Sequence, residues 1–226
     1  MTIKSNSLII VFDLDDTLYK EIDFLKSAYK EIATFLSTKI DKSEASILSE
    51  MMGYYVDKKN AFKEVLDRNN IEEITVNSLL QMYRNHVPNI FLKEEVKDLL
   101  PFLKKEAYKM GLITDGRSVQ QRSKLKALGL LEYFDDIIIS EEFGSEKPNE
   151  NNFKYFTEKY GEAYSYLYIG DNTKKDFVAP NKLNWQSICL LDDGNNIHKQ
   201  SFELGKEKWP TYRIKDLIEI KEIIKN

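Results

Sequence analysis

Five short runs of apolar residues are spread along the chain, and they predict the strands of a buried sheet. The first, Leu-Ile-Ile-Val-Phe, is continuous rather than alternating, which is typical of a strand covered on both faces. Segments with a helical period separate the later runs, and this alternation indicates βαβ units. We therefore expect an α/β fold, with a Rossmann-like core of three layers around a central parallel sheet. The five predicted strands span residues 8–12, 110–114, 137–140, 166–170 and 187–191.

Residues 13–109 separate the first run from the second, whereas a crossover between parallel strands needs only about 12 residues. Apolar side chains in this segment recur at intervals of three and four, as at Phe24, Ala28 and Ile32, which predicts helices. We expect an all-helical insertion over residues 20–92 and a core made of residues 1–19 and 93–226. The insertion could cap an active site or could simply elaborate the core.

The last apolar pattern lies at the C-terminal end. Its residues between Ile214 and Ile224 are spaced as on one face of a helix. We predict an amphipathic helix there that packs on the core rather than binding a partner.

Composition and charge narrow the class of protein. The chain has 226 residues, of which 42% are hydrophobic, and 33 Lys and Arg stand against 37 Asp and Glu. The interspersed charges give no support for nucleic-acid binding. The single cysteine, Cys189, fits a reducing compartment, and the apolar run 8–12 is too short for a signal peptide or a membrane span. We expect a soluble cytoplasmic protein that binds neither nucleic acid nor membrane.

Two acidic clusters follow predicted strands. Asp13, Asp15 and Asp16 come directly after the first strand, and Asp13 and Asp15 are two apart, so they point to the same side of an extended chain. Asp171 and Asp176 follow the fourth strand, and strand ends converge at one edge of a parallel sheet. Carboxylate oxygens without a Cys or His cluster predict a Mg²⁺ site. The alternative for Asp15 or Asp16 is a helix N-cap.

Two further strand ends carry groups suited to an anion. Thr114, Asp115 and Gly116 form a turn that can direct a hydroxyl and backbone N–H groups at a phosphate. Lys147 precedes Pro148 in another loop. A single loop lysine is usually exposed, and only its place among the other strand ends makes Lys147 a candidate ligand.

Taken together, these motifs resemble those of the haloacid dehalogenase superfamily. Four ordered segments carry the resemblance, which covers residues 8–20 and 93–195: DLDDTLY at 13–19, Thr-Asp-Gly at 114–116, Lys147-Pro148 and GDNTKKD at 170–176. The stretch from Ile113 to Pro148 is similar to the pyrimidine nucleotidase and phosphoglycolate phosphatase branches. Their helical cap is inserted after the first motif, where this chain has its own insertion.

The resemblance implies a role for each matching residue. Asp13 would be the nucleophile that forms an aspartyl-phosphate, and Asp15 the general acid and then base. Lys147 would neutralise the nucleophile and the transferred phosphoryl group, whose oxygens Thr114, Asp115 and Gly116 would hold. The remaining implied roles are Mg²⁺ binding by Asp13, Asp171 and the Asp15 carbonyl, with Asn172 and Asp176 in support.

Two further features of the sequence bear on these roles, one against them and one in their favour. Asp115 stands where much of the family has Asn, which adds negative charge near an anionic substrate. Asp15 lies among carboxylates, which predicts a raised pKa that would suit a general acid.

The function expected is a Mg²⁺-dependent phosphatase for a small phosphomonoester, with a nucleoside monophosphate favoured over a sugar phosphate or phosphoglycolate. The insertion carries 10 Lys and Arg against 11 Asp and Glu, and so offers no positive field for a polyanion. A phosphomutase or other phosphotransferase, a dehalogenase and a non-catalytic module that binds a phosphorylated ligand are the alternatives. Asp15 and the acidic turn argue against a dehalogenase, which needs neither.

Overall fold

The computed structural model describes residues 7–203 and 205–225. The chain divides into two compact units. One consists of the residues up to Glu21 together with those from Phe91 onward, and the other spans Ile22–Ile90.

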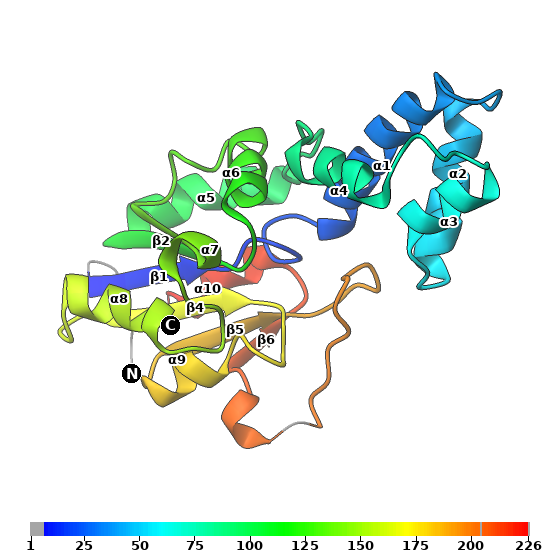
Figure 1. Cartoon of the computed structure of the whole chain (residues 1–226). Coiled ribbons are helices and arrows are strands. Elements are labelled where there is room, and N and C mark those ends of the chain that lie inside the picture. The colour runs from blue at the N-terminus through cyan, green and yellow to red at the C-terminus, as the bar shows by residue number, and fades with distance from the viewer. Residues whose placement is uncertain (1–6, 204, 226) are drawn as a thin grey trace. The chain divides into compact units, whose positions relative to one another are not determined.

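The first unit is built on a six-stranded sheet in the order β3-β2-β1-β4-β5-β6, and all neighbouring strands are parallel (Figure 1). β1 lies inside the sheet, with Val11 paired to Gly111 of β2 on one side and to Tyr168 of β4 on the other. The predicted α/β class and parallel sheet are confirmed. The strands are β1 Leu8–Phe12, β2 Lys109–Thr114, β3 Asp136–Ile139, β4 Ser165–Gly170, β5 Gln186–Leu190 and β6 Tyr212–Ile214.

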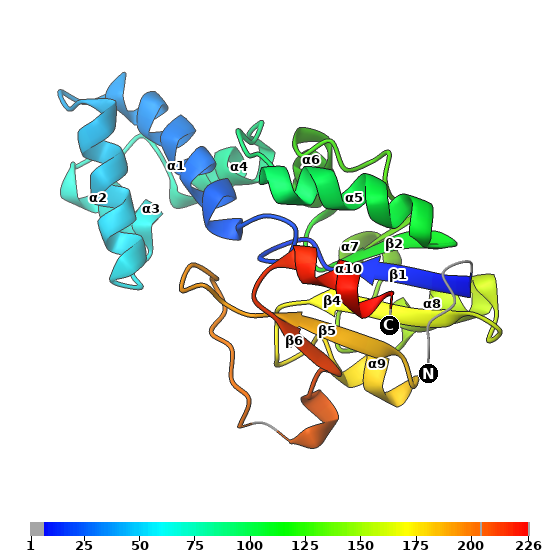
Figure 2. The same cartoon turned by 180° about the vertical axis from the view of Figure 1, so that it is seen from behind.

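Helices cover both faces of this sheet, which explains why β1 is apolar at every position. Ile9 and Val11 belong to a buried cluster with Phe153 and Phe156 of α8. On the opposite face Phe12 meets Phe134 edge-on. Figures 1 and 2 show α8 and α9 on one side of the sheet and α5 and α10 on the other. The helices of this unit are α5 Glu94–Glu106, α6 Ser118–Ala127, α7 Ser140–Phe143, α8 Asn151–Tyr160, α9 Val178–Lys182 and α10 Ile220–Ile223, with short 3₁₀ turns at Lys206–Lys208 and Leu217–Glu219.

The C-terminal segment differs from its prediction. Ile214 ends β6, which pairs with β5, and only the residues after Asp216 are helical, as a 3₁₀ turn followed by α10. The continuous helix expected from Ile214 to Ile224 was therefore wrong. The expectation that the segment packs on the core holds, because Ile214, Leu217 and Ile220 are buried.

The second unit is helical and has a core of its own. Leu25, Ile32 and Leu36 of α1 pack in one buried cluster with Ile47 and Met51 of α2. Side chains of Ser43, Asn60 and Thr75 cap the first turns of the three later helices. The helices are α1 Glu21–Ser37, α2 Glu44–Val56, α3 Ala61–Arg68 and α4 Val76–Asn85.

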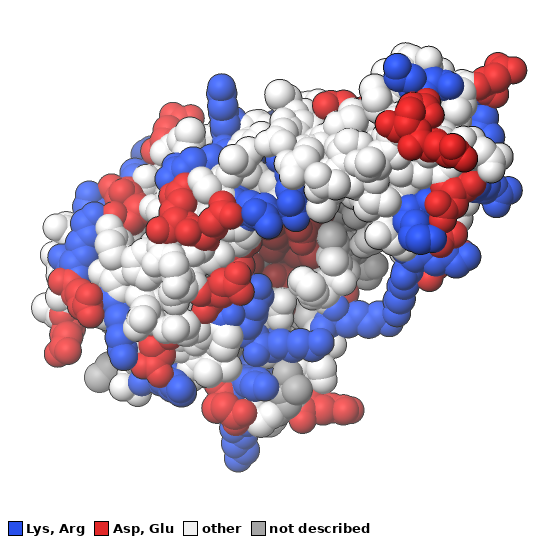
Figure 3. Space-filling model, in the orientation of Figure 1, with Lys and Arg blue, Asp and Glu red and all other residues white. Residues whose placement is uncertain are grey.

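Lys and Arg are interspersed with Asp and Glu over the face shown in Figure 3. Within the described residues, no helix has the length and apolar character needed to cross a bilayer.

Candidate active site

The carboxyl ends of three adjacent strands meet at one pocket of about 120 Å³. Asp13 follows β1, Thr114 ends β2, and Asp171 follows β4. Asp15, Asp115, Lys147 and Asn172 also line it, so most of the residues singled out from the sequence lie together. The remaining lining residues are Asp16, Glu21, Lys175 and His198.

Three buried carboxylates form the most acidic part of the site. Oxygens of Asp13, Asp171 and Asp176 lie within 4.8 Å of one another. Burial raises the pKa of Asp13 despite the opposing effect of Lys147, and burial together with the charges of Asp176 and Asp13 raises the pKa of Asp171. A bound cation offsets both the cost of burying these charges and the repulsion among them, and the donors are all hard oxygens. The residues present therefore fit a divalent metal ion.

Lys147 supplies the fixed positive charge. Its Nζ lies 2.7 Å from Asp13, 2.9 Å from Asp176 and 3.0 Å from the Tyr168 hydroxyl, and the side chain is 1% exposed. Burial lowers the pKa of Lys147, but Asp13 and Asp176 outweigh this effect and raise it well above its usual value. Lys147 is thus a buried ammonium ion and not the exposed loop lysine of the alternative interpretation.

Asp176 also orders the loop that carries Asp171. Its Oδ2 accepts the backbone N–H groups of Asp171 and Asn172, at 3.1 and 2.8 Å. A Cβ at Gly170 would lie 2.5 Å from the same oxygen, so the close approach of this carboxylate requires glycine.

Asp15 has a different environment from Asp13. Lys124 of α6 donates to both Asp15 oxygens, at 2.7 and 2.9 Å, while Gln121 and the Tyr19 hydroxyl donate at 3.0 and 2.5 Å. Burial raises the pKa of Asp15, but Lys124 and these hydrogen bonds outweigh it and lower the pKa overall. The expected rise in the pKa of Asp15 is therefore wrong. The direction of the shift is reversed by Lys124, which lies outside the four motifs.

Asp16 has a structural role. Its Oδ1 accepts the N–H of Glu21, the first residue of α1, and its Oδ2 accepts the N–H of Ile197. Neither Asp15 nor Asp16 is the N-cap of α1, which begins at Glu21, although Asp16 accepts the first N–H of that helix from outside it.

The Thr114 hydroxyl is buried without a hydrogen-bond partner among the described residues, although the side chain lines the pocket. Gly116 has φ of 140° and donates its N–H to Ser140, and a Cβ there would meet Gln121 at 2.6 Å. The Gly116 N–H is thus engaged within the protein, whereas the Thr114 hydroxyl remains available to a bound anion.

The extra charge of Asp115 is paired. Its Oδ1 accepts the backbone N–H of Lys147 at 3.1 Å, and its Oδ2 lies 2.6 Å from Nζ of Lys175. Lys175 belongs to the same GDNTKKD segment as Asp171. Its contact with Asp115 was not predicted from that motif.

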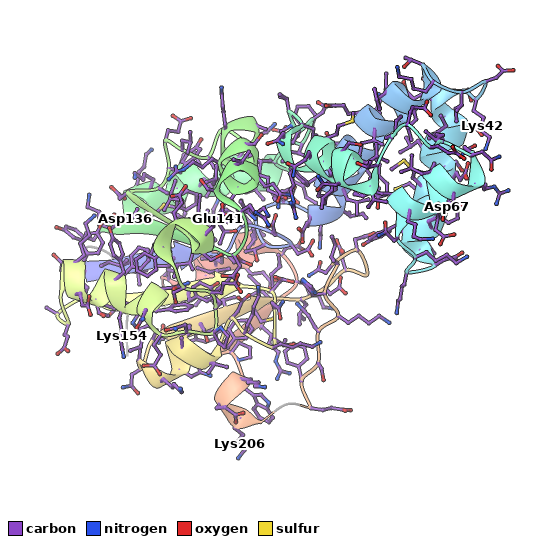
Figure 4. All side chains as sticks on the ribbon, viewed as in Figure 1. Lys42, Asp67, Asp136, Glu141, Lys154 and Lys206 are labelled. Carbon is purple, nitrogen blue, oxygen red and sulfur yellow. The ribbon has the colours of Figure 1, made fainter. Side chains whose placement is uncertain are left out.

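The residues of α6 that contact Asp15 were not predicted from the sequence. Gln121 and Lys124 lie one turn apart on the helix and both reach Asp15. Glu141 of α7, labelled in Figure 4, accepts the Ser118 N–H at the start of α6 and so helps to position the helix. A signal was present, because the spacing of Gln121 and Lys124 places them on one helical face with Leu125.

The segment after β5 was also missed. Asn196 donates to Asp171 at 2.8 Å, Gln200 donates to the Asp171 carbonyl at 2.8 Å, and His198 lines the pocket. The segment is irregular, so its sequence carries no periodicity from which these contacts could be predicted.

Comparison with known proteins places this geometry in a family. Residues 10–190 match the family model of the haloacid dehalogenase-like hydrolases. The chain is 32% identical to a glyceraldehyde 3-phosphate phosphatase of Methanocaldococcus jannaschii over 230 residues, covering 96% of each chain. It is also 32% identical to the Escherichia coli pyrimidine 5'-nucleotidase YjjG, over 51% of this chain and 49% of that protein.

A solved structure shares the fold. The magnesium-bound structure of the putative hydrolase YfnB from Bacillus subtilis superposes with a TM-score of 0.69 at 22% identity, covering 98% of this chain and 100% of that one. The family match and the relative of similar length agree with the resemblance carried by the four motifs. The chain belongs to the haloacid dehalogenase-like hydrolases.

Proposed function

We propose that this hydrolase is a Mg²⁺-dependent phosphatase of small phosphomonoesters that reacts through an aspartyl-phosphate. One observation carries the proposal. The Asp13 carboxylate pairs with the Lys147 ammonium and lies within 4.8 Å of the Asp171 and Asp176 carboxylates, and its pocket also holds the Thr114 hydroxyl, which has no partner among the described residues. The pocket thus holds a carboxylate that can attack phosphorus, a lysine and a metal-binding group of carboxylates that can neutralise charge, and a hydroxyl that can donate to a phosphoryl oxygen.

In the first step an Asp13 oxygen attacks phosphorus, and the bond between phosphorus and the ester oxygen breaks. Asp15 gives a proton to the leaving oxygen, while Lys147 and the Thr114 hydroxyl hold the phosphoryl oxygens. In the second step Asp15 takes a proton from water, which attacks phosphorus and releases Asp13 and inorganic phosphate. The lowered pKa of Asp15 suits the base role in this second step better than the acid role in the first.

Asp13, Asp171 and the Asp15 carbonyl would hold the metal ion, with Asp176 and Asn172 ordering the loop. Bound Mg²⁺ would supply positive charge that offsets the repulsion between a carboxylate and a dianionic phosphate. Chelation by EDTA should abolish turnover and added Mg²⁺ should restore it. Full activity in chelator would overturn the metal assignment.

For the substrate we place a triose phosphate, such as glyceraldehyde 3-phosphate, ahead of a nucleoside monophosphate. The relative named for glyceraldehyde 3-phosphate matches across 96% of the chain, whereas the nucleotidase matches across 51%. The test is phosphate release with Mg²⁺ from glyceraldehyde 3-phosphate, phosphoglycolate and pyrimidine nucleoside monophosphates. A higher kcat/KM for the nucleotides would reverse this order. If the protein bound these compounds but released phosphate from none of them, a non-catalytic module would be favoured.

We further propose that the helical segment 20–92 acts as a cap that contributes to substrate choice. It is inserted shortly after Asp13 and Asp15, which follow β1, and its unit has an independent core. Excision of residues 22–90 should alter the preference among these substrates more than the affinity for Mg²⁺. An unchanged preference in a folded core would contradict the cap role. A cytoplasmic location also stays a prediction.

A further inference from the structure

The pocket carries more negative than positive charge. Six of its lining residues are acidic, namely Asp13, Asp15, Asp16, Glu21, Asp115 and Asp171, and two are lysines. Lys147 is buried and forms ion pairs with Asp13 and Asp176, which neutralise its charge. Lys175 is different, because 31% of its side chain is exposed and its one ion pair among the described residues is with Asp115. It is the lining lysine that a ligand entering the pocket can reach.

Asp115 cannot easily turn its charge away. One oxygen is held by the backbone N–H of Lys147 and the other by Lys175. The carboxylate therefore stays beside Thr114, where the proposed phosphoryl group binds. Without a counter-charge it would repel a dianion at this position.

We propose that Lys175 is a substrate-binding residue that cancels the charge of Asp115 and shares its ammonium with the bound phosphoryl group. An ammonium ion carries three N–H donors, so contact with one Asp115 oxygen leaves donors for phosphoryl oxygens. This inference rests on the proposed phosphatase function and adds a residue to it. Asp115 in place of Asn is then tolerated because Lys175 compensates for it within the same pocket.

An ordinary surface ion pair is the competing explanation, since exposed pairs contribute little to stability or binding. Position argues against it, because both residues line the pocket and their charged atoms lie 2.6 Å apart. Lys174 provides a matched control, since it is the neighbouring residue with the same charge, is exposed, and does not line the pocket.

The test compares Lys175→Met, Asp115→Asn, the double variant and Lys174→Met. Two quantities are measured with Mg²⁺ present: the Kd of inorganic phosphate by calorimetry, and KM and kcat for p-nitrophenyl phosphate. Lys175→Met should raise both Kd and KM about tenfold with a smaller change in kcat, because a binding contact is lost and Asp115 is left unpaired. Asp115→Asn should bind phosphate at least as tightly as wild type, because the Asn side-chain oxygen can still accept the backbone N–H of Lys147 while the negative charge is lost.

The double variant should recover the part of the affinity loss that comes from the uncompensated charge of Asp115, and Lys174→Met should match wild type. Equal behaviour of Lys175→Met and Lys174→Met would overturn the inference and leave the phosphatase proposal intact. A double variant as weak as Lys175→Met would refute compensation of Asp115. If the wild-type protein neither binds phosphate nor hydrolyses the ester, the phosphatase proposal fails and this inference fails with it.

Discussion

Nζ of Lys124 lies 2.7 and 2.9 Å from the two carboxylate oxygens of Asp15, and the lysine side chain is only 2% exposed. The predicted acid–base residue therefore has a buried lysine of its own, just as the predicted nucleophile Asp13 has Lys147. Each carboxylate is thus held by a different helix or loop, and the two can be perturbed separately.

Lys124→Met should destabilise the protein by about 3 kcal/mol, because removing one partner of a buried ion pair leaves the other charge uncompensated. It should also lower kcat, since Asp15 loses two of the hydrogen bonds that orient it. Urea denaturation and steady-state kinetics measure the two effects. Lys126→Met, at an exposed position of the same helix, is the control and should change neither quantity appreciably.

Thr114→Val should separate function from stability. The Thr114 hydroxyl has no recorded partner in the described structure, so its loss should leave the free energy of unfolding unchanged or slightly higher. We expect KM for a phosphomonoester to rise by roughly tenfold if the hydroxyl binds the phosphoryl group.

Thr173→Val is the matched comparison for this experiment. Thr173 is equally buried, but its hydroxyl accepts the N–H of Ser201 at 3.0 Å. Its replacement should cost about 1 kcal/mol. Equal loss of stability in the two variants would show that Thr114 has a structural partner after all.

Asp13→Asn and Asp15→Asn should fail at different steps. The first removes the nucleophile, so turnover should fall by several orders of magnitude and no covalent phosphate should form. The second spares the nucleophile and slows both proton transfers, typically by about 10² to 10⁴. With a good leaving group the first step needs little protonation, so phosphoenzyme should accumulate in Asp15→Asn. Mass spectrometry of the intact protein after rapid quench detects the adduct, and an adduct on Asp13→Asn would overturn the assignment of the nucleophile.

Asp135 gives a pH-dependent contribution to stability away from the pocket. Burial raises the pKa of Asp135, but hydrogen bonds from the Met110 N–H, Lys109 and Lys104 outweigh it and lower the pKa from 3.8 to about 2. A group whose pKa is lower in the folded state stabilises the fold above its unfolded pKa, and this contribution is lost as pH falls through the folded value.

Asp135→Asn should therefore cost about 1 kcal/mol at pH 7, and the difference from wild type should shrink as pH falls below about 4. Urea denaturation from pH 7 to pH 3 measures the trend. Asp98→Asn makes the same charge change at an exposed position and should show little pH dependence. A constant difference for Asp135→Asn across this range would rule out the ionic contribution.

The strands of the sheet centre could be predicted because they are apolar on both faces, a property that each run shows by itself. β6 could not, because it is an edge strand of three residues in which only Ile214 is buried. Its conformation depends on pairing with β5, and local sequence does not display that pairing.

The site divides in the same way. Asp13, Thr114 and Asp171 were predictable because each lies at the carboxyl end of a recognisable strand. Lys124 and Asn196 reach the site through the orientation of α6 and the path of an irregular loop, and these are set by tertiary packing. The pKa of Asp15 was predicted in the wrong direction for this reason, since its sign depends on Lys124.

Asn196 and Gln200, both after the fifth strand, hold Asp171 by its side chain and its carbonyl. The loop that carries Asp171 is therefore completed by residues that follow it by 25 and 29 positions in the sequence. During synthesis on the ribosome, the nascent polypeptide must extend past residue 200 and clear the exit tunnel before Asp171 gains these partners. A nascent chain that already contains all four motifs but has not yet emerged as far as Gln200 would therefore carry an Asp171 loop without these two contacts.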